Sequence, residues 1–104
     1  MDLDRDNPLA AEIRQEVAEA YFAACRKMVD SLEALKTFDR AVGSAPLEKT
    51  RIDRRSELLE EASERVYFVV IQREAMGLSC FEEFFGDYEI PGEVRTRLRP
   101  KRER

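Results

Sequence analysis

The residues that could carry chemistry in this chain are two cysteines, a run of glutamates and several arginines. The chain has no histidine. This excludes Ser-His-Asp and Cys-His nucleophile pairs, histidine zinc ligands and the Glu-x-x-His pairs of helical di-iron sites. The 4 glycines stand singly, so they form no phosphate-binding loop. We therefore expect no enzymatic activity, no cofactor and no metal.

The two cysteines, Cys25 and Cys80, are too few for a disulfide framework. Cys80 follows an expected helix start, where a thiolate is favoured. Free cysteines usually pack as small hydrophobic side chains, and we predict that role for both. Residues 1–6 are acidic and lack the basic and apolar regions of a secretory signal, so we expect a cytoplasmic protein.

Four glutamates in the second half of the chain could bind a divalent cation through their carboxylate oxygens. They are Glu57, Glu60, Glu61 and Glu64. Charge runs on helices usually face solvent, and we predict a solvated surface here.

Arg55 and Arg73 project toward the apolar side of the same segment. A guanidinium that is buried there needs a carboxylate partner. We predict that both arginines form structural ion pairs and do not bind anions.

The segment from Ser79 to Arg99 resembles a helix-turn-helix, with a capped short helix, a glycine-containing turn and a basic end. Its turn is longer than usual, and Gly92 and Glu93 occupy the positions where base-reading side chains are needed. The tail from residue 95 carries +5, which leaves −9 on residues 1–94 from a total of −4. Nucleic-acid binding is therefore the alternative function, through Arg95, Arg97, Arg99, Lys101 and Arg102.

Two long helices are expected to position these residues. Asn7 and Pro8 are typical of a helix start, and Gly43 is typical of a helix end, which predicts a first helix over about 8–42. The short turn after Gly43 predicts an antiparallel second helix of matching length, over about 46–76. The apolar residues of the first helix recur every three or four positions. They are Ile13, Val17, Ala20, Ala24, Met28, Leu35, Phe38 and Val42.

Short helices over about 79–85 and 91–98 are expected to cap this hairpin, with Gly86 ending the first of them. The chain is thus predicted to be all-α, with one domain over residues 1–98 and a disordered basic tail over 99–104. Its longest apolar run, residues 66–71, is too short for a bilayer span, which needs roughly 20 residues.

Residues 66–71 are apolar nearly all round, so this part of the second helix needs cover on more than one side. The aromatic residues of the cap are the natural cover. We predict that Phe81, Phe84 and Phe85 shield Tyr67, Phe68 and Ile71.

The apolar sector of the first helix is wider than the roughly 100° that one neighbouring helix covers. We expect an uncovered part near the Gly43 turn or in the middle, around Phe22 and Val29. Such a surface favours a homodimer or an unidentified protein partner over nucleic acid or membrane. The candidate surface residues are Phe22, Val29, Tyr67, Phe68 and Ile71.

The C-terminal half of the chain also carries a recognisable order of residues. It reads Val70-Ile71-Gln72-Arg73-Glu74, then Gly77-Leu78, then Tyr88-Glu89-Ile90-Pro91-Gly92-Glu93-Val94 up to Leu98. This order resembles a family of short, uncharacterised bacterial all-helical proteins over roughly residues 55–98. The resemblance implies a helical fold and a bacterial source, and it implies no mechanism.

Overall fold

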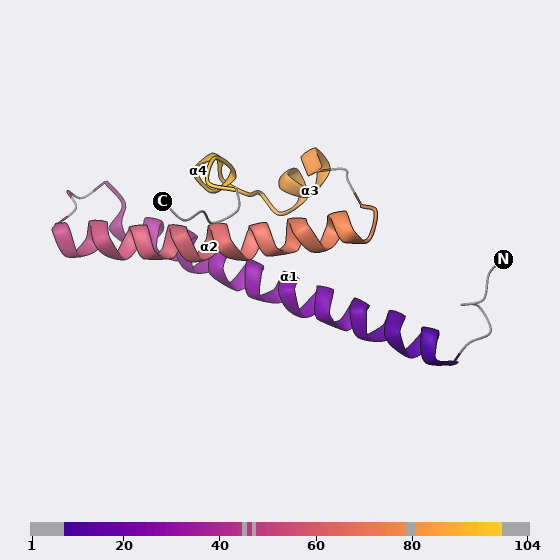
Figure 1. Cartoon of the computed structure of the whole chain (residues 1–104). Helices are drawn as coiled ribbons and strands as arrows, with labels where there is room; N and C mark the ends of the chain where they lie inside the picture. The colour runs from indigo at the N-terminus through magenta and orange to yellow at the C-terminus, as the bar shows by residue number, and fades with distance from the viewer. Residues whose placement is uncertain (1–7, 45, 47, 79–80, 99–104) are drawn as a thin grey trace, which may run out of the picture.

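The chain folds into a hairpin of two long helices with a short helical cap. The computed structural model describes residues 8–44, 46, 48–78 and 81–98. Its helices are α1 (Pro8–Val42), α2 (Lys49–Ala75), α3 (Phe81–Asp87) and α4 (Gly92–Arg95). In Figure 1, α1 and α2 overlap near the turn and diverge toward the N-terminal part of α1, while α3 and α4 lie on the other side of α2. The predicted all-α hairpin with a C-terminal cap is confirmed.

Glycines end both long helices, as the sequence predicts. Gly43 and Gly77 have positive φ angles of 61° and 81°, in the left-handed region that favours glycine. After α2, the backbone N–H of Leu78 donates to the carbonyl of Arg73 at 2.8 Å, which satisfies an otherwise unpaired carbonyl at the helix end.

The second helix begins later than predicted, at Lys49. Glu48 precedes it in an extended conformation and makes no side-chain capping bond. With this later start and an end at Ala75, α2 has 27 residues against 35 in α1. The helices thus differ in length by more than the predicted ranges, 8–42 and 46–76, and the expectation that they match is wrong.

The cap helices also differ from the predicted ranges. Gly86 lies inside α3, and the chain instead turns at Glu89, whose φ is 52°. The N–H of Ile90 donates to the carbonyl of Phe85 at 3.0 Å and closes the end of α3. α4 is a single turn because its hydrogen bonds tighten after Thr96, where Arg97 donates to the carbonyl of Val94, three residues back.

The core lies where α1, α2 and the cap meet. Its largest fully buried side chains come from all three parts of the fold, and they are Met28, Val66, Val69, Phe84 and Val94. Two serines are buried beside them, and each donates its hydroxyl hydrogen to a carbonyl of its own helix, at 2.8 and 2.7 Å. The two buried serine hydroxyls are thus satisfied within their own helices.

The cap covers a different side of α2 from the one predicted. Phe84 is only 2% exposed and packs with the core, as expected. Phe68 and Ile71 remain 51% and 41% exposed, so the prediction that the cap shields them is wrong. Phe84 instead packs in the same buried cluster as Val66 and Val69. Phe68 lies about 200° around α2 from Val66 and therefore faces away from this cluster.

Candidate interaction surface

Two contacts fix how α1 and α2 lie side by side. Nη1 of Arg73 donates to the hydroxyl of Tyr21 at 2.9 Å, and Nε of Arg55 donates to Asp39 at 2.8 Å. In both pairs the residue numbers add to 94, so each residue n of α1 lies level with residue 94 − n of α2. Ala75, the last residue of α2, is therefore level with Glu19.

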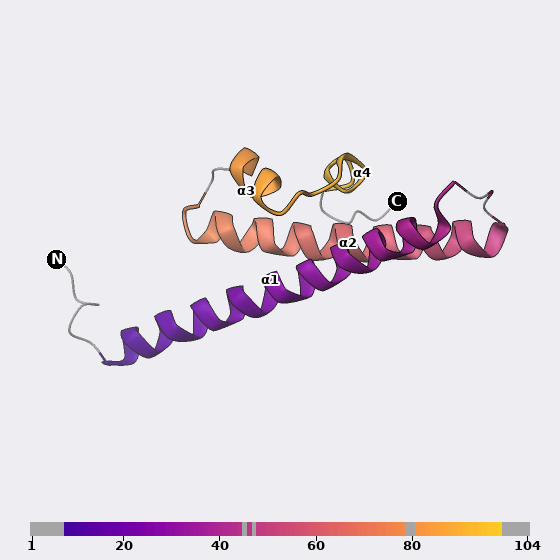
Figure 2. The ribbon, with the colours of Figure 1, turned by 180° about the vertical axis from the view of Figure 1, so that it is seen from behind.

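Residues 8–18 of α1, which we call the arm, consequently extend past the end of α2. At 1.5 Å per residue the arm is about 16 Å long. Figures 1 and 2 both show the N-terminal part of α1 running on beyond the end of α2. Within the described residues, no helix lies opposite the arm.

The arm continues the apolar stripe that is buried further along α1. Ile13 and Val17 both lie within about 20° of the buried Ala24 around the helix. Leu9, Ile13 and Val17 are nevertheless 61%, 52% and 47% exposed. The arm therefore exposes apolar side chains on the same face of α1 that forms the core further along the helix.

Of the two places where an uncovered part of α1 was expected, the middle exposes Phe22 and Val29, whereas the end near the Gly43 turn is covered. Near the Gly43 turn, Leu35 is buried and Phe38 and Val42 are half-buried. By the same register Val42 is level with Ile52, so α2 runs past the end of α1 here, and the part of α1 without a neighbouring helix in the described chain lies at its N-terminus. The start of α2 decides how much of α1 has no neighbour. A second helix that starts at Pro46, as predicted, reaches further along α1 and leaves a shorter overhang.

The predicted surface residues are mostly exposed, and they lie on both long helices. Phe22 and Val29 are exposed on α1, as are Phe68 and Ile71 on α2, whereas Tyr67 is half-buried. Phe22 and Val29 lie about 160–180° around α1 from Ile13. They therefore face away from the side on which the arm is apolar.

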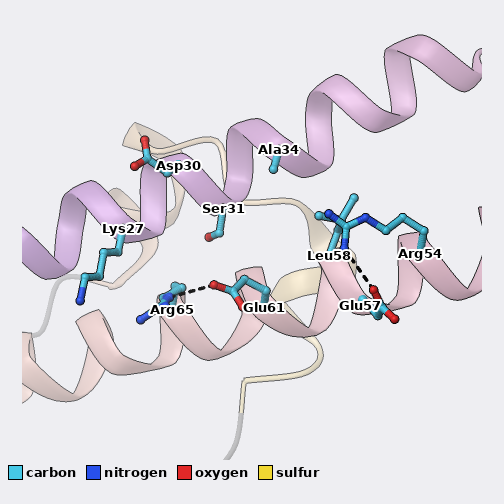
Figure 3. A pocket seen from close by; sticks show the side chains of 9 residues that line it. All are labelled: Lys27, Asp30, Ser31, Ala34, Arg54, Glu57, Leu58, Glu61 and Arg65. Carbon is cyan, nitrogen blue, oxygen red and sulfur yellow. Dashed lines mark hydrogen bonds and ion pairs between the residues drawn. The ribbon is translucent and has the colours of Figure 1, made fainter.

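An open groove of about 570 Å³ runs between α1 and α2 (Figure 3). Its lining is mostly charged and contains both signs. Arg54 pairs with Glu57 at 3.1 Å and Arg65 pairs with Glu61 at 3.2 Å, while the carboxylate of Asp30 points away from α2. Because these charges largely compensate one another, the groove has no concentrated field for an ionic ligand.

Arg55 joins the hairpin to the cap through two carboxylates. It donates to Asp39 of α1 at 2.8 and 3.0 Å and to Glu93 of α4 at 3.0 and 2.8 Å. These bonds to Arg55 lower the pKa of Asp39 and of Glu93 below their ordinary values. The ion pairing predicted for Arg55 is confirmed, and we call this trio the Arg55 clasp.

Arg73 behaves differently from the prediction. Its guanidinium lies 4.8 Å from the ring centroid of Phe84 and donates to Tyr21, and its buried Nε has no hydrogen-bond partner among the described residues. Within the described residues it forms no ion pair with a carboxylate. The negative face of the Phe84 ring replaces the carboxylate as the group that stabilises this cation.

The glutamate run and the cysteines are the remaining candidate sites. Glu60, for example, pairs with Arg97 at 3.5 Å, and the four glutamates of the run are exposed. Among the described residues, no three cysteine, aspartate or glutamate side chains are placed to hold a metal ion. Cys25 is a buried free thiol, whereas Cys80 lies outside the described residues.

The basic C-terminal residues that the structure describes also have internal partners. Arg95 pairs with Glu82 at 3.1 Å and lies 4.4 Å from the ring centroid of Phe85. α4 has four residues and is about 6 Å long, short of the roughly 12 Å width of a major groove. Arg99, Lys101 and Arg102 lie outside the described residues.

Comparison with known proteins adds no relative. No family model matches the chain, and neither a curated protein nor a solved structure does. Within the described residues, no helix has the combination of length and apolar character that a membrane span requires.

Proposed function

We propose that this chain is a non-enzymatic interaction protein that self-associates through the arm. The observation that carries the proposal is that Leu9, Ile13 and Val17 continue the core stripe of α1 past the end of α2. A helix face of this kind is normally buried against another element.

The exposed area suggests a weak and reversible association. Full burial of a large aliphatic side chain stabilises by about 1.5–3 kcal/mol, so the burial of a half-exposed one contributes roughly 0.75–1.5 kcal/mol. Association itself costs at least about 4 kcal/mol, which six such side chains from two arms only modestly exceed. At most about 5 kcal/mol therefore remains, and we expect a dimer with a dissociation constant of about 0.2 mM or weaker.

The shape of the molecule agrees with this proposal. Its extents are 62 × 31 × 22 Å and its radius of gyration is 17.5 Å. A compact domain of about 100 residues has a radius of gyration near 13 Å. The protein is therefore extended, and the arm contributes to that extension.

The alternative of nucleic-acid binding has less support. Arg95 and Arg97 are engaged with Glu82 and Glu60, and the described body is acidic. Binding through the tail would weaken steeply as salt is raised. Fluorescence anisotropy with a labelled duplex at two salt concentrations tests this alternative.

Sedimentation equilibrium at about 1 mM protein, above the expected dissociation constant, tests the proposal with two matched variants. Ile13→Asp places a charge in the apolar stripe, whereas Ala18→Asp adds the same charge about 140° around the arm. We expect Ile13→Asp to be monomeric at concentrations where the wild type and Ala18→Asp are dimeric. Equal masses for all three proteins would contradict the proposal.

A further inference from the structure

We propose that the arms of two copies pack antiparallel on a two-fold axis that passes beside Ile13. This inference rests on the proposed function, since it specifies how the chain self-associates. Two independent features of the arm place the axis at the same residue.

The first feature is the spacing of the apolar residues. Leu9 and Val17 lie four residues on either side of Ile13. An antiparallel pair centred on Ile13 brings Leu9 against Val17 of the partner subunit and Ile13 against Ile13 of the partner subunit. Each copy thus uses the same patch, as a two-fold interface requires.

The second feature is the length of the overhang. The arm covers residues 8–18, whose midpoint is also residue 13. A second arm centred there packs on the side of α1 that α2 leaves open. The start of that second helix is then level with residue 18 of the first copy, next to the end of α2. The carbonyl end of α2 then approaches the amide end of the partner's α1, and these helix termini carry opposite partial charges.

The other exposed apolar patches do not fit the same partner helix. Phe22 and Val29 lie on the opposite side of α1, so a straight helix cannot cover both them and the arm. Phe68 and Ile71 lie on α2, and Glu64 and Glu74 accompany them on exposed positions of that helix. The arm is the longest stripe, and it is the part of α1 without a neighbouring helix in the described chain.

The charges beside the stripe give this arrangement a distinctive salt dependence. Glu12 and Glu16 lie on one flank of Ile13, and Arg14 lies on the other. A two-fold axis of this kind brings like flanks together, so four carboxylates gather along one edge of the interface. Their repulsion is screened by salt, and the dimer should therefore tighten as salt is raised.

Disulfide trapping tests the position of the axis. The background carries Cys80→Ser and keeps the buried Cys25. Ile13→Cys should form a crosslinked dimer about ten times faster than Ala18→Cys, because the axis brings two copies of residue 13 together. A mixture of Leu9→Cys and Val17→Cys should crosslink faster than either variant alone.

Sedimentation of the unmodified protein separates the two ways of failing. If the wild type dimerises while Ile13→Cys reacts no faster than Ala18→Cys and the mixture shows no preference, another surface forms the dimer and this inference is overturned. A dimer that weakens as salt is raised would also overturn it. If the wild type stays monomeric throughout, the proposed function itself fails.

Discussion

Phe84 is the residue on which the cap depends. Its ring is buried among side chains of α1, α2 and the cap, and Arg73 lies against its face. Phe84→Ala should lower the free energy of unfolding by about 3–5 kcal/mol, because it opens a cavity in the core. Urea denaturation checks this, with the half-exposed Phe68→Ala as the control. A similar loss in both variants would show that the cap does not contribute a buried anchor.

The Arg55 clasp should make stability depend on pH. Asp39 and Glu93 have lowered pKa values in the folded protein, so their contribution is present above their unfolded pKa values and is lost as pH falls through the folded ones. Since these groups are partly exposed, we expect Arg55→Met to destabilise by about 1 kcal/mol at pH 7. This difference should shrink below about pH 4, as measured by urea denaturation. A difference that stays constant down to pH 2 would contradict this role.

The two arginines also show how far sequence reasoning reaches at this scale. A cation on an apolar face predicts a partner, and Arg55 has two carboxylates. The partners of Arg73 are an aromatic ring and a tyrosine hydroxyl, which lie on α3 and α1. Which type of partner meets a side chain depends on tertiary packing, and the helical pattern contains no such information.

The helices themselves follow local signals where those signals are strong. The start at Pro8 and the ends at Gly43 and Gly77 were predictable, because the backbone geometry there favours these residue types. The turn at Glu89 was not predictable, because glutamate has no preference for the left-handed region. Gly86, three residues earlier, is the residue type that more often ends a helix. The full length of the arm was not predicted, because it depends on where α2 starts, and no residue before Lys49 marks that start.

Hydrogen exchange should distinguish the arm from the rest of α1. At low protein concentration, amides of residues 12–18 should exchange faster than those of residues 24–35, because no described element packs on the arm. Raising the concentration should slow exchange in the arm selectively as dimers form. Exchange in the arm that is equally slow at all concentrations would mean that this segment is already covered in the monomer.

At the scale of the whole molecule, three surfaces with different chemistry surround one small core. The cap side is closed by the Arg55 clasp, the groove between α1 and α2 is neutralised by its own ion pairs, and the arm is apolar and has no neighbouring helix among the described residues. The arm therefore has the strongest physical reason to meet a second molecule.

Sedimentation equilibrium of the wild-type protein tests this conclusion most directly. Across loading concentrations from about 50 μM to about 2 mM, which extend well past the expected limit of about 0.2 mM, the average mass should rise from 12.1 kDa toward twice that value. Ile13→Asp should keep the mass of the monomer over the same range. A wild-type mass that stays at 12.1 kDa at every concentration would contradict self-association through the arm.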